Sequence, residues 1–246
     1  LRPSPFAERS TLGRDEEHED VRVLAALNAL HARERGRFSE VSARADAYGL
    51  AYRMGASAPE ALDLSTEDPR TLEAYQVDAP KGEHPLSIGP GPFGRQCLIA
   101  RRLLERGVRF VQIYHGGGHQ QQTWDAHHRV EENLSIHGPE IDGPIAALLD
   151  DLERTGLLDE TLVVWGGEFG RQPVSQMAGQ FQVANPTGRD HNPKGFTMWL
   201  AGAGVRPGPY GATDEIGSEA VEDRHHVRDL HATILHLLGL DHEHLT

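Results

Sequence analysis

Histidine and carboxylate side chains gather in the second half of the sequence, where they could bind a metal ion. Twelve of the fifteen histidines fall between residues 115 and 244. One group lies in a loop rich in glycine and glutamine, where Asp125 and His127 flank a single alanine. An oxygen donor beside a nitrogen donor suits Zn²⁺ or Mn²⁺. The alternative is a polar surface loop that carries histidines by chance.

A second group follows the apolar run 161–165, where Gly166 and Gly167 precede Glu168. Two glycines allow a sharp backbone turn that would present the carboxylate of Glu168 to a metal. Arg171 follows in the same loop and could bind an anionic substrate through a bidentate contact. The alternative is a structural ion pair between Glu168 and Arg171.

The third group combines Asp190 and His191 with two histidines nearer the C-terminus, His226 and His231. Adjacent Asp and His can ligate two neighbouring metals, or one metal together with a group that orients its ligand. His226 precedes the last predicted helix, where its ring is accessible. His231 lies on the apolar face of that helix, so a buried structural histidine is an equal alternative there.

Composition and missing context exclude several other functions. The net charge of −13 argues against nucleic acid and against anionic membrane surfaces. No apolar run is long enough to predict a membrane-spanning helix. The glycine pattern at 89–94 precedes a helix, but Pro90 and Pro92 lack the N–H donors that a dinucleotide pyrophosphate needs. The single cysteine, Cys97, excludes an intrachain disulfide, and we predict that it is a buried core residue.

The elements that must position these groups alternate between helices and strands. Apolar spacing predicts helices over 15–54 (a hairpin broken near Gly36), 59–64, 94–105, 143–154 and 227–238, and strands over 109–114, 161–165 and 196–200. This alternation predicts an α/β fold with a mostly parallel sheet, in which ligand-bearing loops follow the strand ends. We expect residues 1–92 to form a helical and loop segment packed on an α/β metal-binding core at 93–246.

Several runs of sequence match the motifs of one bacterial family. They include Phe93-Gly94-Arg95-Gln96-Cys97-Leu98, Trp124-Asp125-Ala126-His127, Gly166-Gly167-Glu168-Phe169-Gly170-Arg171, Gly188-Arg189-Asp190-His191-Asn192-Pro193, and the closing run from Asp229 to His242. In these motifs the chain resembles the family known as domain of unknown function 1501, over nearly its whole length. The resemblance implies a place in the alkaline phosphatase and sulfatase superfamily. The fold expected from it is a three-layer sandwich around a mostly parallel central sheet, with metal ligands at the strand ends.

The residue patterns and the resemblance together give a set of candidate site residues. The expected metal ligands are Asp125, His127, Glu168, Asp190, His191, His226 and His231, and Arg171 is expected to bind the substrate anion. Relatives usually show Asp-His where Glu168-Phe169 stands, and Asp190-His191 would then supply the missing pair. The cofactor would be a divalent ion, either Zn²⁺, Mn²⁺ or Ca²⁺.

The leading functional expectation is a metal-dependent hydrolase of phosphate or sulfate esters of small molecules or carbohydrates. The alternatives are a non-catalytic metal-binding or carbohydrate-binding module, and a structural domain with incidental histidines. The chain begins at Leu1 rather than Met and reads as the later part of a longer protein, exported or periplasmic by resemblance. We expect the nucleophile outside it, because nothing in residues 1–60 resembles the segment that carries it in the family. An unpaired sheet edge would favour a homo-oligomer.

Overall fold

The computed structural model describes residues 14–35, 39–116, 124–175 and 187–245. The chain divides into two compact units, Leu1–Thr66 and Glu67–Thr246. The first unit is helical, and the second contains the candidate site. Among the described residues, no helix combines the length and apolar character that crossing a membrane requires.

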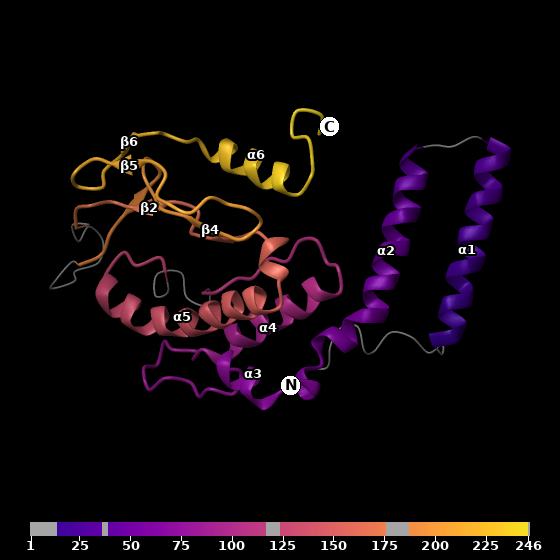
Figure 1. The fold of residues 1–246 in the computed structure, drawn as a ribbon, viewed down its shortest axis with the longest axis horizontal. Helices are drawn as coiled ribbons and strands as arrows, with labels where there is room; N and C mark the ends of the chain where they lie inside the picture. The colour runs from indigo at the N-terminus through magenta and orange to yellow at the C-terminus, as the bar shows by residue number, and fades with distance from the viewer. Residues whose placement is uncertain (1–13, 36–38, 117–123, 176–186, 246) are drawn as a thin grey trace. The chain divides into compact units, whose positions relative to one another are not determined.

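Two helices make up most of the first unit, as the apolar spacing predicts. Helix α1 spans Arg14–Arg35 and α2 spans Ser39–Leu62, followed by a short 3₁₀ helix, η1, at Leu64–Thr66 (Figure 1). Helix α2 continues through Pro59, so most of the separate helix expected at 59–64 is instead its last turn. The two predicted helices are confirmed, and the break expected near Gly36 lies outside the described residues.

Three helices build the core of the second unit. They are α3 (Pro69–Ala74), α4 (Gly91–Glu105) and α5 (Val130–Arg154). Asp68 caps α3, because its Oδ1 accepts a hydrogen bond from the backbone N of Arg70 at 2.7 Å. The helix predicted at 94–105 is confirmed as α4.

Helix α5 begins much earlier than the sequence predicts. We expected it to start near residue 143 with Pro144 in its first turn, but it starts at Val130 and contains both Pro139 and Pro144. Each proline removes one backbone donor and disfavours the helix locally. Burial of Ile141, Leu148 and neighbouring residues outweighs that preference, since packing supplies most of the stability of a protein helix.

The core of this unit lies among α3, α4, α5 and the turn after α3. Its buried apolar side chains include Tyr75, Val77, Phe93, Cys97, Leu98, Ile141, Leu148 and Leu152. Gly94 permits the close approach of α4 to this turn, because a Cβ atom there would overlap the carbonyl oxygen of Tyr75. Cys97 is buried, which confirms its predicted place in the core, and burial raises the pKa of its thiol to about 12.

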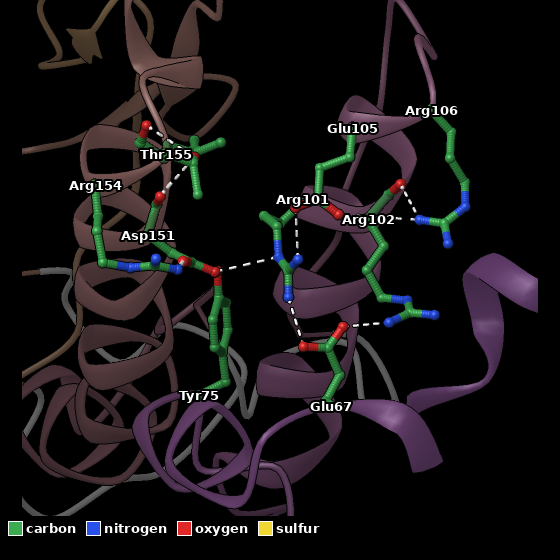
Figure 2. Close-up of polar contacts among 10 residues, drawn as sticks. Glu67, Tyr75, Arg101, Arg102, Glu105, Arg106, Asp151, Arg154 and Thr155 are labelled. Carbon is green, nitrogen blue, oxygen red and sulfur yellow. Dashed lines mark hydrogen bonds and ion pairs between the residues drawn. The ribbon is translucent and has the colours of Figure 1, made fainter.

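A buried network of ion pairs connects α4 to Glu67, to Tyr75 and to Asp151 on α5 (Figure 2). Arg101 donates through Nη2 to Glu67 Oε2 at 2.8 Å, and its Nε lies 3.1 Å from Asp151 Oδ2 on α5. Arg102 also pairs with Glu67, and the Tyr75 hydroxyl donates to Asp151 at 3.1 Å. Because charges are costly to bury alone, each member of this network depends on the others.

The strands form separate antiparallel pairs, which corrects the predicted fold. Strand β1 (Val163–Trp165) pairs with β4 (Trp199–Ala201), β2 (Gly170–Arg171) with β3 (His191–Asn192), and β5 (Ala212–Thr213) with β6 (Ala220–Glu222). The expected α/β three-layer sandwich with a mostly parallel central sheet, of the alkaline phosphatase type, is therefore wrong. Parallel neighbours need a long crossover, usually a helix, and no described residue between β1 and β4 is helical.

Two of the three predicted strands are present in the structure, and one is not. The runs 161–165 and 196–200 contain or overlap β1 and β4, whereas residues 109–114, all described, form no strand. An apolar run favours extended backbone, but it does not specify a partner strand. Val164 and Trp165 are 37% and 38% exposed instead of buried on both faces, because β1 has only one neighbour among the described strands.

The C-terminal helix closely matches its prediction. Helix α6 spans Val227–Leu237, and Gly239 follows with a φ of 74°, a left-handed conformation common after helices. His226 caps this helix, because its Nδ1 accepts a hydrogen bond from the backbone N of Arg228 at 3.1 Å. In return, Asp229 Oδ2 accepts one from the backbone N of His226 at 2.7 Å. All residues of α6 are described, and none of them is buried.

Candidate metal centre

Three of the predicted ligands converge in the structure: Asp125, His127 and His191. Asp125 Oδ1 lies 3.1 Å from His127 Nε2 and 2.9 Å from His191 Nε2, and the two ring nitrogens are 3.1 Å apart. Among the described residues, they form the one cluster of three or more candidate ligands whose donor atoms all lie within 4.8 Å of one another. Candidate ligands from the first and third predicted groups therefore meet.

The triangle of donor atoms has the size that a bound metal needs. Ligand atoms 2.0–2.1 Å from a tetrahedral Zn²⁺ lie about 3.3 Å apart, and neighbouring ligands of an octahedral ion at similar bond lengths lie about 3.0 Å apart. The observed sides of 2.9–3.1 Å require only small shifts in either case. The side chains of Asp125 and His191 are 38% and 42% exposed, so part of the coordination sphere would face solvent.

Backbone contacts bring the two ligand-bearing segments together. The backbone N of Arg189 donates to the carbonyl oxygen of Ala126 at 3.1 Å, between Asp125 and His127. Gly188 packs on the peptide bond that follows His127, where a Cβ atom would overlap the backbone. Glycine has no Cβ, so it is the residue that this approach requires.

Strand β2 places Arg171 between the two segments, opposite His191 in the β2–β3 register. Its Nη2 donates to Asp125 Oδ1 at 2.6 Å and to the carbonyl oxygen of Trp124 at 3.1 Å, while Nη1 donates to the carbonyl oxygen of Arg189 at 3.2 Å. Burial raises the pKa of Asp125, but hydrogen bonds from His191 and Arg171 outweigh it and bring the pKa below its ordinary value. The carboxylate is therefore ionised, which is the form that binds a metal. Anion binding by Arg171 stays a prediction.

The ring of Phe169 packs against the ring of His191. Their centroids are 4.2 Å apart, with an angle of 36° between the ring planes. In this chain the aromatic ring contacts a candidate ligand and limits its rotation.

The other predicted ligands lie outside this cluster. Asp190 is adjacent, with its Oδ1 4.0 Å from His127 Nδ1. Glu168 is exposed in the loop after β1 and is not part of the cluster. His226 uses its Nδ1 to cap α6, and His231 is exposed on the same helix, so it is not the buried core residue of the alternative interpretation.

Two buried polar residues beside the centre were missed by the sequence analysis. They are His137 and Glu140 on α5, whose side chains are both 3% exposed and joined by an Nδ1–Oε2 distance of 2.8 Å. Residues three apart on a helix lie on the same face, so the spacing is a usable signal. It becomes visible only once α5 is known to extend back to Val130, because residues 130–142 were not expected to be helical.

Fold and site together define a protein with a helical core and an open cluster of one carboxylate and two histidines. The chain belongs to the family described as protein of unknown function (DUF1501), whose family model matches residues 3–246. No curated protein and no solved structure matches the chain. The family resemblance is thus confirmed, and the match lends no support to a place in the alkaline phosphatase and sulfatase superfamily.

Proposed function

We propose that this chain binds a divalent transition metal through Asp125, His127 and His191. The observation that carries the proposal is the triangle of donor atoms with sides of 2.9–3.1 Å. Each histidine Nε2 lies within hydrogen-bonding distance of both the carboxylate oxygen and the other Nε2. A neutral imidazole has only one N–H, so this geometry is hard to satisfy with protons alone. A cation at the centre would satisfy all three atoms at once.

The donor set favours some metals over others. Imidazole nitrogens suit Zn²⁺, whereas Mn²⁺ favours oxygen donors such as the carboxylate and Ca²⁺ prefers a shell of oxygen atoms. Two of the three donor atoms here are nitrogens, so Ca²⁺ is the weakest of the three expected ions. Two histidines and one carboxylate with open positions also describe the iron(II) sites of oxygenases. Fe²⁺ therefore belongs in a test of metal preference.

We further propose that the centre serves hydrolysis of phosphate or sulfate esters in the full-length protein. A metal held at this site would polarise an ester oxygen as a Lewis acid. The residues of this chain would hold the ligands in place: Arg171 keeps Asp125 ionised and oriented, and Phe169 limits the rotation of His191. Three protein ligands with part of the site open to solvent is the pattern of catalytic rather than structural zinc.

A partly exposed aromatic pair favours the alternative function, a carbohydrate-binding module. The rings of Trp165 and Trp199 stack across β1 and β4, with centroids 6.0 Å apart and planes within 11°. Trp165 remains 38% exposed. Large aromatic faces offer apolar contact area, which suits the C–H face of a sugar ring. A Trp165→Ala variant that binds oligosaccharides as well as the parent would exclude this surface.

Metal binding is tested by titration calorimetry on chelator-treated protein, with Zn²⁺, Mn²⁺, Fe²⁺ and Ca²⁺ supplied separately. We expect one ion per chain, with binding lost in His127→Ala and in His191→Ala. The matched control is His231→Ala, which removes an exposed histidine outside the cluster and should bind like the parent. Equal binding by His127→Ala and the parent chain would exclude the centre.

Turnover separates the hydrolase from the non-catalytic module. Aryl phosphate and aryl sulfate are assayed with the full-length protein and with this chain, each supplied with the metals that bind. We expect metal-dependent turnover by the full-length protein and little or none by this chain, whose nucleophile is predicted to lie elsewhere. Metal binding without turnover by the full-length protein would favour the non-catalytic module.

A further inference from the structure

A second buried polar cluster lies beside the metal centre and has no part in the proposed metal binding. Its middle is the carboxylate of Glu140, which is 3% exposed. Glu140 Oε1 accepts hydrogen bonds from Ser87 Oγ at 2.6 Å and from the backbone N of Ile88 and of Gly89 at 2.7 and 2.9 Å. These donors, together with a hydrogen bond to His137, offset the cost of burying the carboxylate, and its pKa lies below the ordinary value.

The other oxygen of Glu140 faces two histidines. His137 Nδ1 lies 2.8 Å from Oε2, and His115 Nε2 lies 3.3 Å from the same atom. The second ring nitrogen of His115, Nδ1, is 2.9 Å from the indole Nε1 of Trp124. His115 therefore stands between a buried carboxylate and a tryptophan side chain.

The tryptophan determines where the proton of His115 resides. An indole N–H can only donate, so His115 Nδ1 must accept the hydrogen bond of Trp124. A neutral imidazole then carries its one proton on Nε2, which faces Glu140 Oε2. The Trp124 indole thus donates to His115, whose Nε2–H faces Glu140 Oε2 at 3.3 Å without reaching hydrogen-bond geometry. Burial favours the neutral form of His115 by lowering its pKa.

Trp124 directly precedes the candidate ligand Asp125, so anything that holds Trp124 also restrains Asp125. Its indole is held by His115, and the rings of Trp124 and His137 are 5.9 Å apart. Its carbonyl oxygen accepts a hydrogen bond from Arg171, the residue that also donates to Asp125 Oδ1. Trp124 is therefore restrained at its side chain by the buried cluster and at its backbone by Arg171.

We propose that His115 and Glu140 are positioning residues of the metal centre, acting on Asp125 through the indole of Trp124. This inference rests on the proposed metal binding by Asp125, His127 and His191. Groups that orient metal ligands from outside the coordination sphere typically change metal affinity by about 10- to 100-fold when they are removed. We therefore expect a loss of affinity in that range when the Trp124–His115 hydrogen bond is removed.

Two series of variants of this chain remove that bond from either side. Trp124→Phe keeps an aromatic ring and deletes the N–H, and its matched control is Trp165→Phe, which changes a tryptophan distant in sequence from the ligands. His115→Leu deletes both ring nitrogens. His115→Gln retains an acceptor for Trp124 and a donor for Glu140, so we expect it to restore most of the affinity. The double variant Trp124→Phe/His115→Leu should bind about as weakly as either single variant, because both remove the same contact.

The readout is the Zn²⁺ dissociation constant by calorimetry, with the folded state of each variant checked by circular dichroism. The expected result is weakening of 10-fold or more in Trp124→Phe and in His115→Leu, with Trp165→Phe and His115→Gln close to the parent. If one of the weakening variants fails to fold, the other one decides. Parent-like affinity in a folded Trp124→Phe or His115→Leu would overturn the positioning role while leaving the metal centre intact. Absence of Zn²⁺ binding by the parent would instead overturn the proposed function, and this inference with it.

Discussion

Gly188 lies directly against the peptide bond that follows His127, so closely that a Cβ atom at residue 188 would overlap that backbone. The contact is accompanied by the hydrogen bond from the Arg189 backbone N to the Ala126 carbonyl oxygen. It brings His191 next to Asp125, although 66 residues separate them in sequence. The candidate metal centre therefore depends on a residue that carries no ligand atom.

We expect Gly188→Ala to weaken Zn²⁺ binding and to lower the free energy of unfolding by about 1–3 kcal/mol, because an extra methyl group must push the two segments apart. The matched control is Gly138→Ala in α5, where a Cβ atom would meet no atom within 4 Å. Alanine there should be neutral or stabilising by up to about 1 kcal/mol. Urea denaturation and Zn²⁺ titration measure both effects, and equal Zn²⁺ affinity of the two variants would contradict the role of Gly188.

Alanine variants of His226, which caps α6, and of His231 within α6 are expected to differ in stability but not in metal content. His226→Ala removes the side chain that caps the helix, so it should cost about 1 kcal/mol. His231→Ala changes an exposed residue and should stay within about 0.5 kcal/mol of the parent. Thermal or urea denaturation distinguishes these values. If elemental analysis shows that either variant has lost metal, that histidine is a metal ligand, as the sequence predicts.

The buried ion network and an exposed ion pair provide a matched comparison of charge removal. Asp151→Asn removes one of the three carboxylates that pair with the nearly buried Arg101, while Glu67 and Glu105 remain. We therefore expect a loss of about 1.5–3 kcal/mol, the range for a hydrogen bond to a charged group. Asp78→Asn breaks the pair with Arg95, whose side chains are 77% and 49% exposed, and should cost no more than about 1 kcal/mol. Urea denaturation of both variants is the measurement. Similar losses would show that the network is not a source of stability.

The free energy of unfolding should fall as the pH drops below about 6.5, the ordinary pKa of histidine. Burial lowers the pKa of His115, the carboxylate of Glu140 opposes that shift, and His137 adds to it. Just below about pH 6.5, His115 is protonated in the unfolded chain but stays neutral in the folded chain. Lowering the pH therefore stabilises the unfolded state relative to the folded state. Urea denaturation between about pH 5.5 and 7.5, above the range in which carboxylates titrate, measures how steeply the free energy of unfolding depends on pH. His115→Gln should make this dependence shallower, and an unchanged dependence would exclude His115 as its source.

How much of this protein could be predicted from its sequence depends on whether the signal is local. Helices α1, α2, α4 and α6 follow from apolar residues at helical spacing and from Gly239 as a stop signal, which neighbouring residues determine on their own. The burial of Cys97 follows from the same spacing. Asp125, His127 and His191 stood out as candidate ligands because of their residue types, their short spacing and the family motifs that contain them. These features need no knowledge of distant parts of the chain.

The tertiary structure alone decided the rest. Residues 161–165 favour extended backbone, but their antiparallel pairing with 199–201 depends on a partner that the run itself does not encode. Helix α5 continues through Pro139 and Pro144 because packing outweighs a local penalty. Asp125 meets His191 rather than Glu168 because Gly188 and Arg171 bring two particular segments together. Such long-range contacts are set by the packing of the whole unit, so no short window of sequence reveals them.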